Sequence, residues 1–216
     1  MNTLHPDPGA CLGGACPACL LRAEAEETPK PLDWTDLPGH ESVKRAVEVA
    51  LVGPHPMLLI ATPGYGATRF TDLVGVRIVP PCPCGQLGNP RRACTCEVPE
   101  IAAHQRAWRA DTYDLVVEAP PMTVREMFEE GVRRESFAVA KARALAARER
   151  VVGPPDAPSI ALLRAAACQL GITWEVLARI RAVATSIAAL DHAAHVEAQH
   201  MAEAIQYAPR PTTEGR

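Results

Sequence analysis

The sequence predicts a small α/β unit followed by a C-terminal helical unit, with helix predominating overall. Only nine of the 216 residues are aromatic, so Ala, Val and Leu must form most of the core. Such residues suit packed helices better than a β-sandwich. Short continuous apolar runs, which are typical of buried strands, occur within 57–121, and helical periodicity dominates the remainder.

We expect three parts along the chain. Residues 1–38 form a leader with six prolines and a net charge of −4, so mostly irregular structure is predicted there. Residues 39–122 hold a shortened α/β unit that includes a cysteine-rich loop. Residues 123–216 hold the helical domain.

The α/β unit opens with a helix and two strands. "HESVKRAVEVAL" over 40–51 places Val43 and Val47 on one face and charged residues on the other, which predicts an amphipathic helix. "GPHP" ends this helix. The apolar runs 57–61 and 73–79 then predict two buried strands.

A further helix and strand close the unit. Residues 100–109 predict a short helix, and "YDLVVEAPP" over 113–121 predicts a strand that two prolines stop. "TVRE" follows as a capping box, in which Thr123 accepts from the backbone three residues on and Glu126 reaches back. The helix that starts here is expected to continue into 133–150.

Three more helices are predicted in the C-terminal domain. The stretch "GPPDAP" over 153–158 predicts a linker. Apolar periodicity then predicts helices near 159–170, 174–190 and 196–207.

Charge and composition exclude several classes of protein. The net charge of −3 lacks the overall basic character typical of nucleic-acid-binding domains. No apolar run of about 18 residues and no signal-like N-terminus is found, so we expect a cytoplasmic protein without a membrane partner. Eight cysteines in such a reducing compartment indicate metal or redox chemistry more than disulfides.

Four cysteines within fifteen residues form the strongest motif. In "CPCGQLGNPRRACTC" the pair Cys82 and Cys84 precedes the pair Cys94 and Cys96. Two thiolate pairs on turns can converge tetrahedrally on one zinc ion, whose role would be structural because no ligand position is left for water. Free thiols or oxidised pairs are the alternatives, and C-x-C is tighter than the usual C-x-x-C spacing.

A second cysteine group lies in the leader. Cys11, Cys16 and Cys19 supply three thiolates, with His5 as a fourth candidate ligand. This is a weaker metal signal, and the alternative is a leader whose cysteines have no specific role.

The stretch "LLIATPGYGATRF" over 58–70 has the form of a strand that runs into a phosphate-binding loop. That loop requires Gly, four residues, Gly, Lys and then Ser or Thr. Ala61 takes the first glycine position and Gly66 the second. Ala67 takes the lysine position and Thr68 the hydroxyl position. The stretch is therefore a working nucleotide-binding site, a chance match to the motif, or a nucleotide-binding site that has lost its chemistry.

Other residues of interest have ordinary explanations. Cys168, on an apolar helix face, is expected to lie in the core. Three histidines are expected at helix-surface or capping positions rather than as ligands: His192, His195 and His200. A basic stretch could meet phosphates, but a solvated helix face is favoured. Its residues are Arg133, Arg134, Lys141, Arg143, Arg148 and Arg150.

Three stretches together resemble the magnesium-chelatase-like AAA+ ATPases, in particular the ComM/YifB branch. "DLPGHESVKRAVEVA" is similar to the helix before the phosphate loop of that family. "CPCGQLGNPRRACTC" followed by "YDLVVEAPP" resembles its cysteine loop and next strand. "LLRAAACQLGITWEVLARIRAVATSIAALDHAAHVEAQHMAEAIQY" resembles its helical lid domain. The resemblance implies an α/β remnant of an AAA+ P-loop core joined to a lid-like domain.

The positions that carry catalysis in that family differ here. The phosphate-loop lysine aligns with Ala67, and the section with the acidic metal-binding motif is missing. A water-orienting asparagine aligns with Pro80, and a candidate arginine finger aligns with Thr112. A lid arginine aligns with Glu175, a charge reversal expected to face the nucleotide. Since phosphoryl transfer depends on positioned charge, the resemblance implies a degenerate, non-hydrolysing protein.

Four functional hypotheses follow. The favoured one is a protein that binds an intact AAA+ relative or another protein through its lid or zinc loop. A second is weak binding of ATP and magnesium, with Gly64, Gly66 and the amides up to Thr68 cradling phosphates at a helix N-terminus. Arg69 would then supply charge. A third is a DNA-binding module that uses the basic stretch, and a fourth is a product without a selected function.

Overall fold

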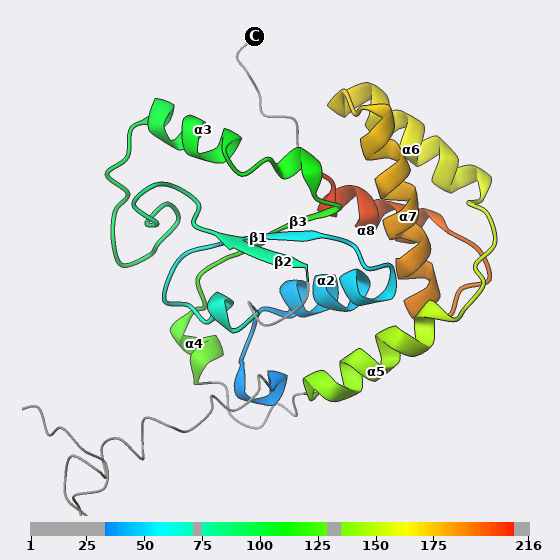
Figure 1. The fold of residues 1–216 in the computed structure, drawn as a ribbon, viewed down its shortest axis with the longest axis horizontal. Helices are drawn as coiled ribbons and strands as arrows, with labels where there is room; N and C mark the ends of the chain where they lie inside the picture. Colours follow the sequence, from blue (N-terminus) through cyan, green and yellow to red (C-terminus); the bar gives the residue numbers. More distant parts are fainter. Residues whose placement is uncertain (1–32, 71–74, 129–134, 210–216) are drawn as a thin grey trace, which may run out of the picture. The chain divides into compact units, whose positions relative to one another are not determined.

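A computed structural model describes residues 33–70, 75–128 and 135–209 (Figure 1). These residues belong to one compact unit, Leu32–Arg216. The leader expected at 1–38 therefore lies almost wholly outside the described residues.

Three parallel strands form the sheet, in the order β2-β1-β3. β1 (Met57–Ala61) is central and pairs with β2 (Val76–Val79) on one side and with β3 (Leu115–Ala119) on the other. The first residues of the three strands lie opposite one another in the register. Because the strands are parallel, their carboxyl ends meet at one edge of the sheet and their amino ends at the other.

The strand sequences explain why the sheet is buried. β1 reads "MLLIA", the kind of continuous apolar run found in strands covered on both faces. Met57 and Leu59 join the main apolar core on one face, and Leu58 packs with Val79 and Trp108 on the other. All three predicted strands are confirmed.

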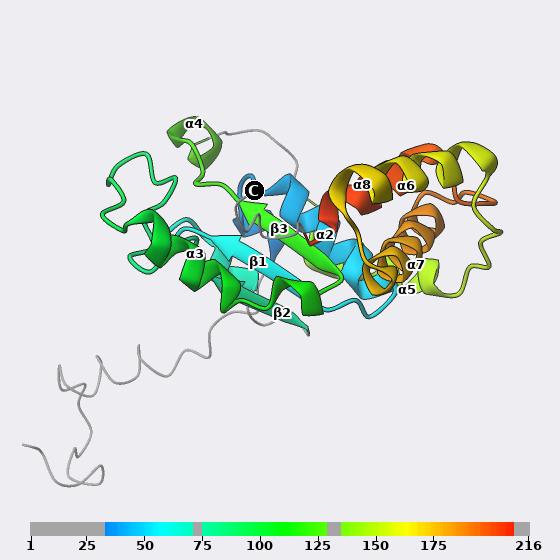
Figure 2. The same cartoon turned by 90° about the horizontal axis from the view of Figure 1, so that it is seen from above.

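Helices cover both faces of this sheet (Figures 1 and 2). α2 (Glu41–Val52) lies on the main-core face, and its predicted stripe, which includes Val43 and Val47, is buried. α3 (Val98–Arg106) runs over the opposite face. The predicted helices at these two places are confirmed.

Within the described residues, five helices follow β3. They are the short α4 (Val124–Met127), α5 (Phe137–Arg148), α6 (Ala157–Leu170), α7 (Trp174–Leu190) and α8 (Ala198–Tyr207). α7 and α8 pack against each other, and α6 packs on α8. No described helix combines the length and the apolar character needed to cross a membrane.

Side-chain caps set the starts of several helices. The predicted capping box is confirmed, because the Glu126 amide donates to Thr123 Oγ1 at 3.2 Å and the Thr123 amide donates to Glu126 Oε2 at 2.7 Å. Ser136 caps α5 and Asp156 caps α6 in the same way. Each such cap satisfies a backbone donor that the helix itself leaves unpaired.

A single apolar cluster contains residues of the sheet, α2, α5, α7 and α8. It therefore includes residues from both sides of the boundary expected near 122. That boundary remains a prediction. The predicted fold class, an α/β remnant with a helical C-terminal part, is confirmed.

Three polar side chains, of which His55 and Ser186 are buried and Asp114 is half-buried, join the sheet to α7. Nδ1 of His55, just before β1, lies 2.7 Å from Oδ2 of Asp114, just before β3. Nε2 of the same ring lies 2.9 Å from Oγ of Ser186 in α7. This connection holds α7 at the amino edge of the sheet.

The prediction for Cys168 is wrong, and the prediction for His200 is incomplete. Cys168 is exposed rather than in the core, because α6 is apolar almost all round and turns this side outward. His200 caps α8, as expected, since its Nδ1 accepts from the Glu197 amide at 2.9 Å, but its side chain is fully buried. His192 and His195 are exposed.

The His55 connection predicts a specific loss of stability. His55→Ala leaves the buried Ser186 hydroxyl and the Asp114 carboxylate without a partner, so we expect a loss of about 2–4 kcal/mol. Ser186→Ala removes one hydrogen bond and should cost about 1 kcal/mol. Urea unfolding measures both.

The matched control is His195→Ala, because that side chain is exposed. It should change the free energy of unfolding by less than about 0.5 kcal/mol. Equal losses for His55→Ala and His195→Ala would contradict a role for the buried connection.

Candidate metal centre and phosphate-like loop

Three connecting segments leave the carboxyl edge of the sheet. The segment 62–67, here called the phosphate-like loop, follows β1. The segment 82–96, here called the metal loop, comes soon after β2, and Pro120 and Pro121 follow β3. Parallel pairing therefore brings the two predicted sites to the same edge.

Two glycines give the phosphate-like loop its backbone shape. Gly64 has φ of 90° and Gly66 has φ of 84°, values that other residues rarely adopt. A Cβ on Gly66 would also lie 2.9 Å from Cδ1 of Leu37. His40 Nε2 lies 2.8 Å from the carbonyl oxygen of Tyr65 and holds the loop from the α2 side. The loop therefore keeps the sharp turn of a phosphate-binding loop.

The residues that follow this turn differ from those of a working phosphate-binding site. Ala67, at the lysine position, is buried and apolar. It begins a 3-10 turn, Ala67–Phe70, at the end of this described segment. The expectation of a helix N-terminus at this place stays a prediction, because the residues that follow Phe70, 71–74, lie outside the described part of the chain. The side chains of Thr68 and Arg69 lie outside the described part of the chain.

Two other aligned positions carry no catalytic group at this edge. Pro80 lies at the carboxyl edge, where its carbonyl oxygen is 3.0 Å from His104 Nε2, and it has no polar side chain. Thr112 lies before β3, at the amino edge, and its hydroxyl donates to the Arg109 carbonyl at 2.7 Å. Neither residue can position water at the phosphate-like loop.

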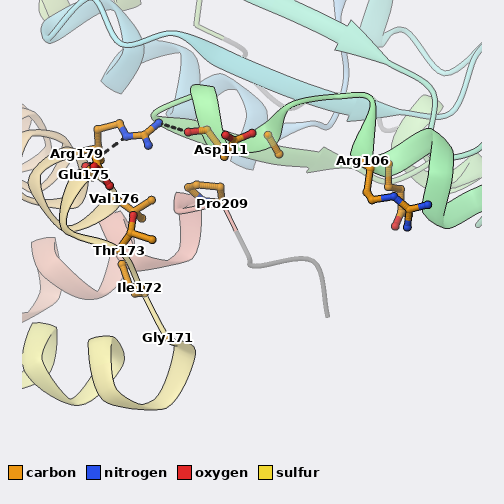
Figure 3. A pocket seen from close by; sticks show the side chains of 11 residues that line it. Arg106, Asp111, Gly171, Ile172, Thr173, Glu175, Val176, Arg179 and Pro209 are labelled. Carbon is orange, nitrogen blue, oxygen red and sulfur yellow. Dashed lines mark hydrogen bonds between the residues drawn. The ribbon is translucent and has the colours of Figure 1, made fainter. Parts of the chain in front are cut away.

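Glu175 lies in the first turn of α7, far from the position expected for it. It lines a pocket of about 480 Å³ together with Asp111 and Arg179 (Figure 3). Arg179 donates to the Asp111 and Tyr113 carbonyls just before β3, which fixes this pocket at the amino edge of the sheet. The expectation that Glu175 faces a nucleotide is therefore wrong within this chain, because the phosphate-like loop lies at the opposite edge.

Glu175 lies two residues after Thr173, the N-cap residue of α7. Its own backbone amide and the Thr173 hydroxyl bond to its carboxylate and hold the pKa of that carboxyl below its usual range. A carboxylate in the first turn also interacts favourably with the helix dipole.

The four cysteines of the metal loop meet at one point. The Sγ atoms of Cys82 and Cys84 are 3.5 Å apart, those of Cys84 and Cys94 3.7 Å, and those of Cys94 and Cys82 3.6 Å. With Cys96, all four sulfurs lie within 4.8 Å of one another. Four sulfurs held 2.3 Å from one ion are about 3.8 Å apart in a tetrahedron. The predicted convergence is confirmed, and the cluster can hold a metal ion.

Backbone donors surround these sulfurs. The Leu87 amide donates to Cys82 Sγ at 3.3 Å, and the Cys84 amide donates to Cys96 Sγ at 3.4 Å. The tight C-x-C spacing is compatible with this because Gly85, with φ of 73°, turns the chain directly after Cys84. Hydrogen bonds from amides favour the thiolate form that binds metal.

The thiols differ in their readiness to ionise. Backbone amides of Thr95 and Gln86 lower the pKa of Cys84 to about 6. The Cys84 amide favours the Cys96 thiolate, but desolvation and the neighbouring sulfurs outweigh it and raise the pKa of Cys96 to about 12. The pKa of Cys94 is also raised, since desolvation and the sulfurs of Cys82 and Cys84 outweigh the Cys96 amide. A cation is therefore needed to bring all four sulfurs to the thiolate form together.

The leader cysteines Cys11, Cys16 and Cys19, together with His5, lie outside the described residues. The metal loop is the one group of ligands that the described part of the chain brings together. The second metal site stays a prediction.

The basic stretch is largely used within the protein. Arg143 Nη2 pairs with Glu135, 2.7 Å away, and with the buried Glu48 of α2. Arg148 donates to the Leu51 and Val52 carbonyls at the end of α2. Both arginines therefore stabilise the contact between α5 and α2, a role that charge counting does not reveal. The two arginines at 133 and 134 lie outside the described residues.

Sequence reasoning missed His40, Tyr65 and Asn89. Tyr65 donates its hydroxyl to Asn89 Oδ1 at 3.1 Å and so joins the phosphate-like loop to the metal loop. No motif identifies such a pair, because the two residues are 24 positions apart in the chain.

Comparison with protein families gives two matches. A model described as magnesium chelatase, subunit ChlI, matches residues 33–76, and one described as magnesium chelatase, subunit ChlI C-terminal, matches residues 122–208. The chain belongs to the magnesium-chelatase-like AAA+ family. The phosphate-like loop lies in the first matched range and α5 to α8 in the second. The metal loop of this family member lies between the two ranges, and no curated protein matches the chain.

The thiol pKa values predict that metal binding releases protons. At neutral pH Cys84 is mostly ionised, whereas the raised pKa values keep Cys94 and Cys96 protonated. Binding of Zn²⁺ by four thiolates should then release at least two protons, so affinity should rise by at least about 100-fold per pH unit between roughly pH 6 and 8.

Calorimetric titration in two buffers of different ionisation enthalpy counts these protons. A pH-independent affinity with no proton release would contradict tetrathiolate binding.

Proposed function

We propose that the chain is a degenerate member of its family that does not hydrolyse ATP and acts by binding a partner. The observation that carries this proposal is the phosphate-like loop. It has the glycine turn, but buried Ala67 stands where a lysine would neutralise phosphate charge. Catalysis of phosphoryl transfer rests almost entirely on such charges.

Weak nucleotide binding is the less supported alternative. The amides around Gly64 and Gly66 remain as donors, but no regular helix among the described residues adds its dipole to them. The ring of His40, which lies beside this loop, already bonds to the Tyr65 carbonyl.

We further propose that the metal is zinc and that its role is structural. Four cysteine ligands with sulfurs 3.5 to 3.7 Å apart fit tetrahedral zinc, and a closed set of four thiolates leaves no position for a reactive water. The same cysteine loop, together with the closing "HMAEAIQY", supports placement in the ComM/YifB branch.

Exposed apolar side chains on the lid-like helices support a partner-binding role. Trp174 is 76% exposed at the start of α7, next to the exposed Leu170 at the end of α6. Val98, directly after the metal loop, is 79% exposed. Exposed Trp side chains are enriched among residues that dominate protein interfaces. We propose an intact AAA+ relative or another protein as the partner.

A DNA-binding role has less support. The two arginines that it would use, Arg143 and Arg148, already pair with Glu48, Glu135 and backbone carbonyls. Freeing them for phosphates would break contacts between α5 and α2.

The purified protein should hydrolyse Mg-ATP no faster than a control without protein. Glu175→Arg, which restores the lid charge, should leave this rate unchanged because Glu175 lies at the amino edge of the sheet. Release of inorganic phosphate measures both. Hydrolysis above background that Glu175→Arg alters would refute the proposal.

Purified protein should contain one zinc ion per chain by elemental analysis. Cys96→Ser should lose it, because a serine hydroxyl does not replace a thiolate on zinc. The matched control is Cys168→Ser, whose exposed thiol is outside the cluster and whose metal content should equal that of the wild type. Equal zinc in the two variants would exclude the cysteine cluster as the zinc site.

A further inference from the structure

Few backbone hydrogen bonds within the metal loop hold its conformation. Between Cys82 and Glu97 the chain forms neither helix nor strand. Its backbone hydrogen bonds include only two tight turns, from the Gly85 amide to the Cys82 carbonyl and from the Asn89 amide to the Gln86 carbonyl, both at 2.9 Å. A metal bound by the four cysteines would therefore be the main constraint on this segment.

Asn89 transmits that constraint. Its Oδ1 accepts from the Arg91 amide at 2.9 Å, and its Nδ2 donates to Gln86 Oε1 at 2.6 Å. Both partners belong to the metal loop, so the fold of this loop fixes the direction of the Asn89 side chain. The second lone pair of Oδ1 accepts the Tyr65 hydroxyl at 3.1 Å.

Tyr65 lies at the centre of the phosphate-like loop. Its side chain is buried against the metal loop, and its carbonyl is held by His40 from the other side. A second contact lies close by, because a Cβ on Gly85 would be 3.2 Å from Pro63. The two loops therefore touch at two places.

We infer that metal bound by the four cysteines fixes the conformation of the phosphate-like loop through Asn89 and Tyr65. The inference rests on the proposed metal centre. It makes the carboxyl edge of the sheet a surface that depends on metal, so a partner that recognises this edge would bind only the metal-loaded protein.

Hydrogen–deuterium exchange with mass spectrometry tests this coupling on the full chain. Exchange in peptides that span 62–67 is compared between zinc-loaded protein and protein stripped with a chelator. Metal removal should speed exchange there by about tenfold or more, with α7 and α8 peptides unchanged. Zinc-loaded Tyr65→Phe should keep its zinc and exchange about fivefold faster in the same peptides, because one hydrogen bond is lost.

The matched control is zinc-loaded Tyr113→Phe, because the Tyr113 hydroxyl bonds only Arg77 near the other edge of the sheet. It should leave exchange over 62–67 unchanged. If stripped protein with confirmed metal loss exchanges like the loaded protein, the coupling is overturned while the metal centre stands. A protein that never retains zinc overturns the metal centre and the coupling with it. If stripping unfolds the whole chain, the Tyr65→Phe result decides, and wild-type exchange in that variant overturns the coupling.

Discussion

The parallel pairing of β1 with both of its neighbours is the constraint on which the rest of the structure depends. It places the phosphate-like loop, the metal loop and the segment after β3 at one edge of the sheet. α7 lies at the other edge, the amino edge of the sheet. His55 holds it there through its contacts with Asp114 and with Ser186 of α7. The lid-like helices and the phosphate-like loop are therefore separated within the chain, and a lid residue such as Glu175 cannot compensate for chemistry lost at the loop.

Each edge of the sheet carries one cluster of polar or sulfur-containing side chains, and both clusters have a structural character. Asp114, His55 and Ser186 have the connectivity of a catalytic triad, but His55 and Ser186 are buried and a Cβ on Gly53 would lie 2.1 Å from His55 Nε2. No substrate can reach this serine, so the set is a link between elements. At the carboxyl edge the sulfur cluster has the same character, since four thiolates saturate an ion. These two structural clusters support the proposal that the protein acts by binding and not by catalysis.

The sequence predicted the fold class, the order of the elements and the convergence of the cysteines, because these depend on local signals. Thr123 and Glu126 make their cap within one turn, and C-x-C pairs need only a turn to converge. The failures concern relations between elements. α6 is apolar almost all round, so periodicity could not tell that Cys168 faces outward. Alignment to a family motif gave Glu175 a role without its position relative to the sheet.

We propose that the phosphate-like loop has the backbone turn of a phosphate-binding loop but lacks the charged groups that bind phosphate. Calorimetric titration of Mg-ATP into zinc-loaded protein tests it most directly, because zinc loading holds the loop in the conformation described. We expect no heat beyond dilution up to millimolar nucleotide, since Ala67 offers no positive charge to the phosphates. Saturable binding that a Gly66→Val substitution abolishes would contradict it.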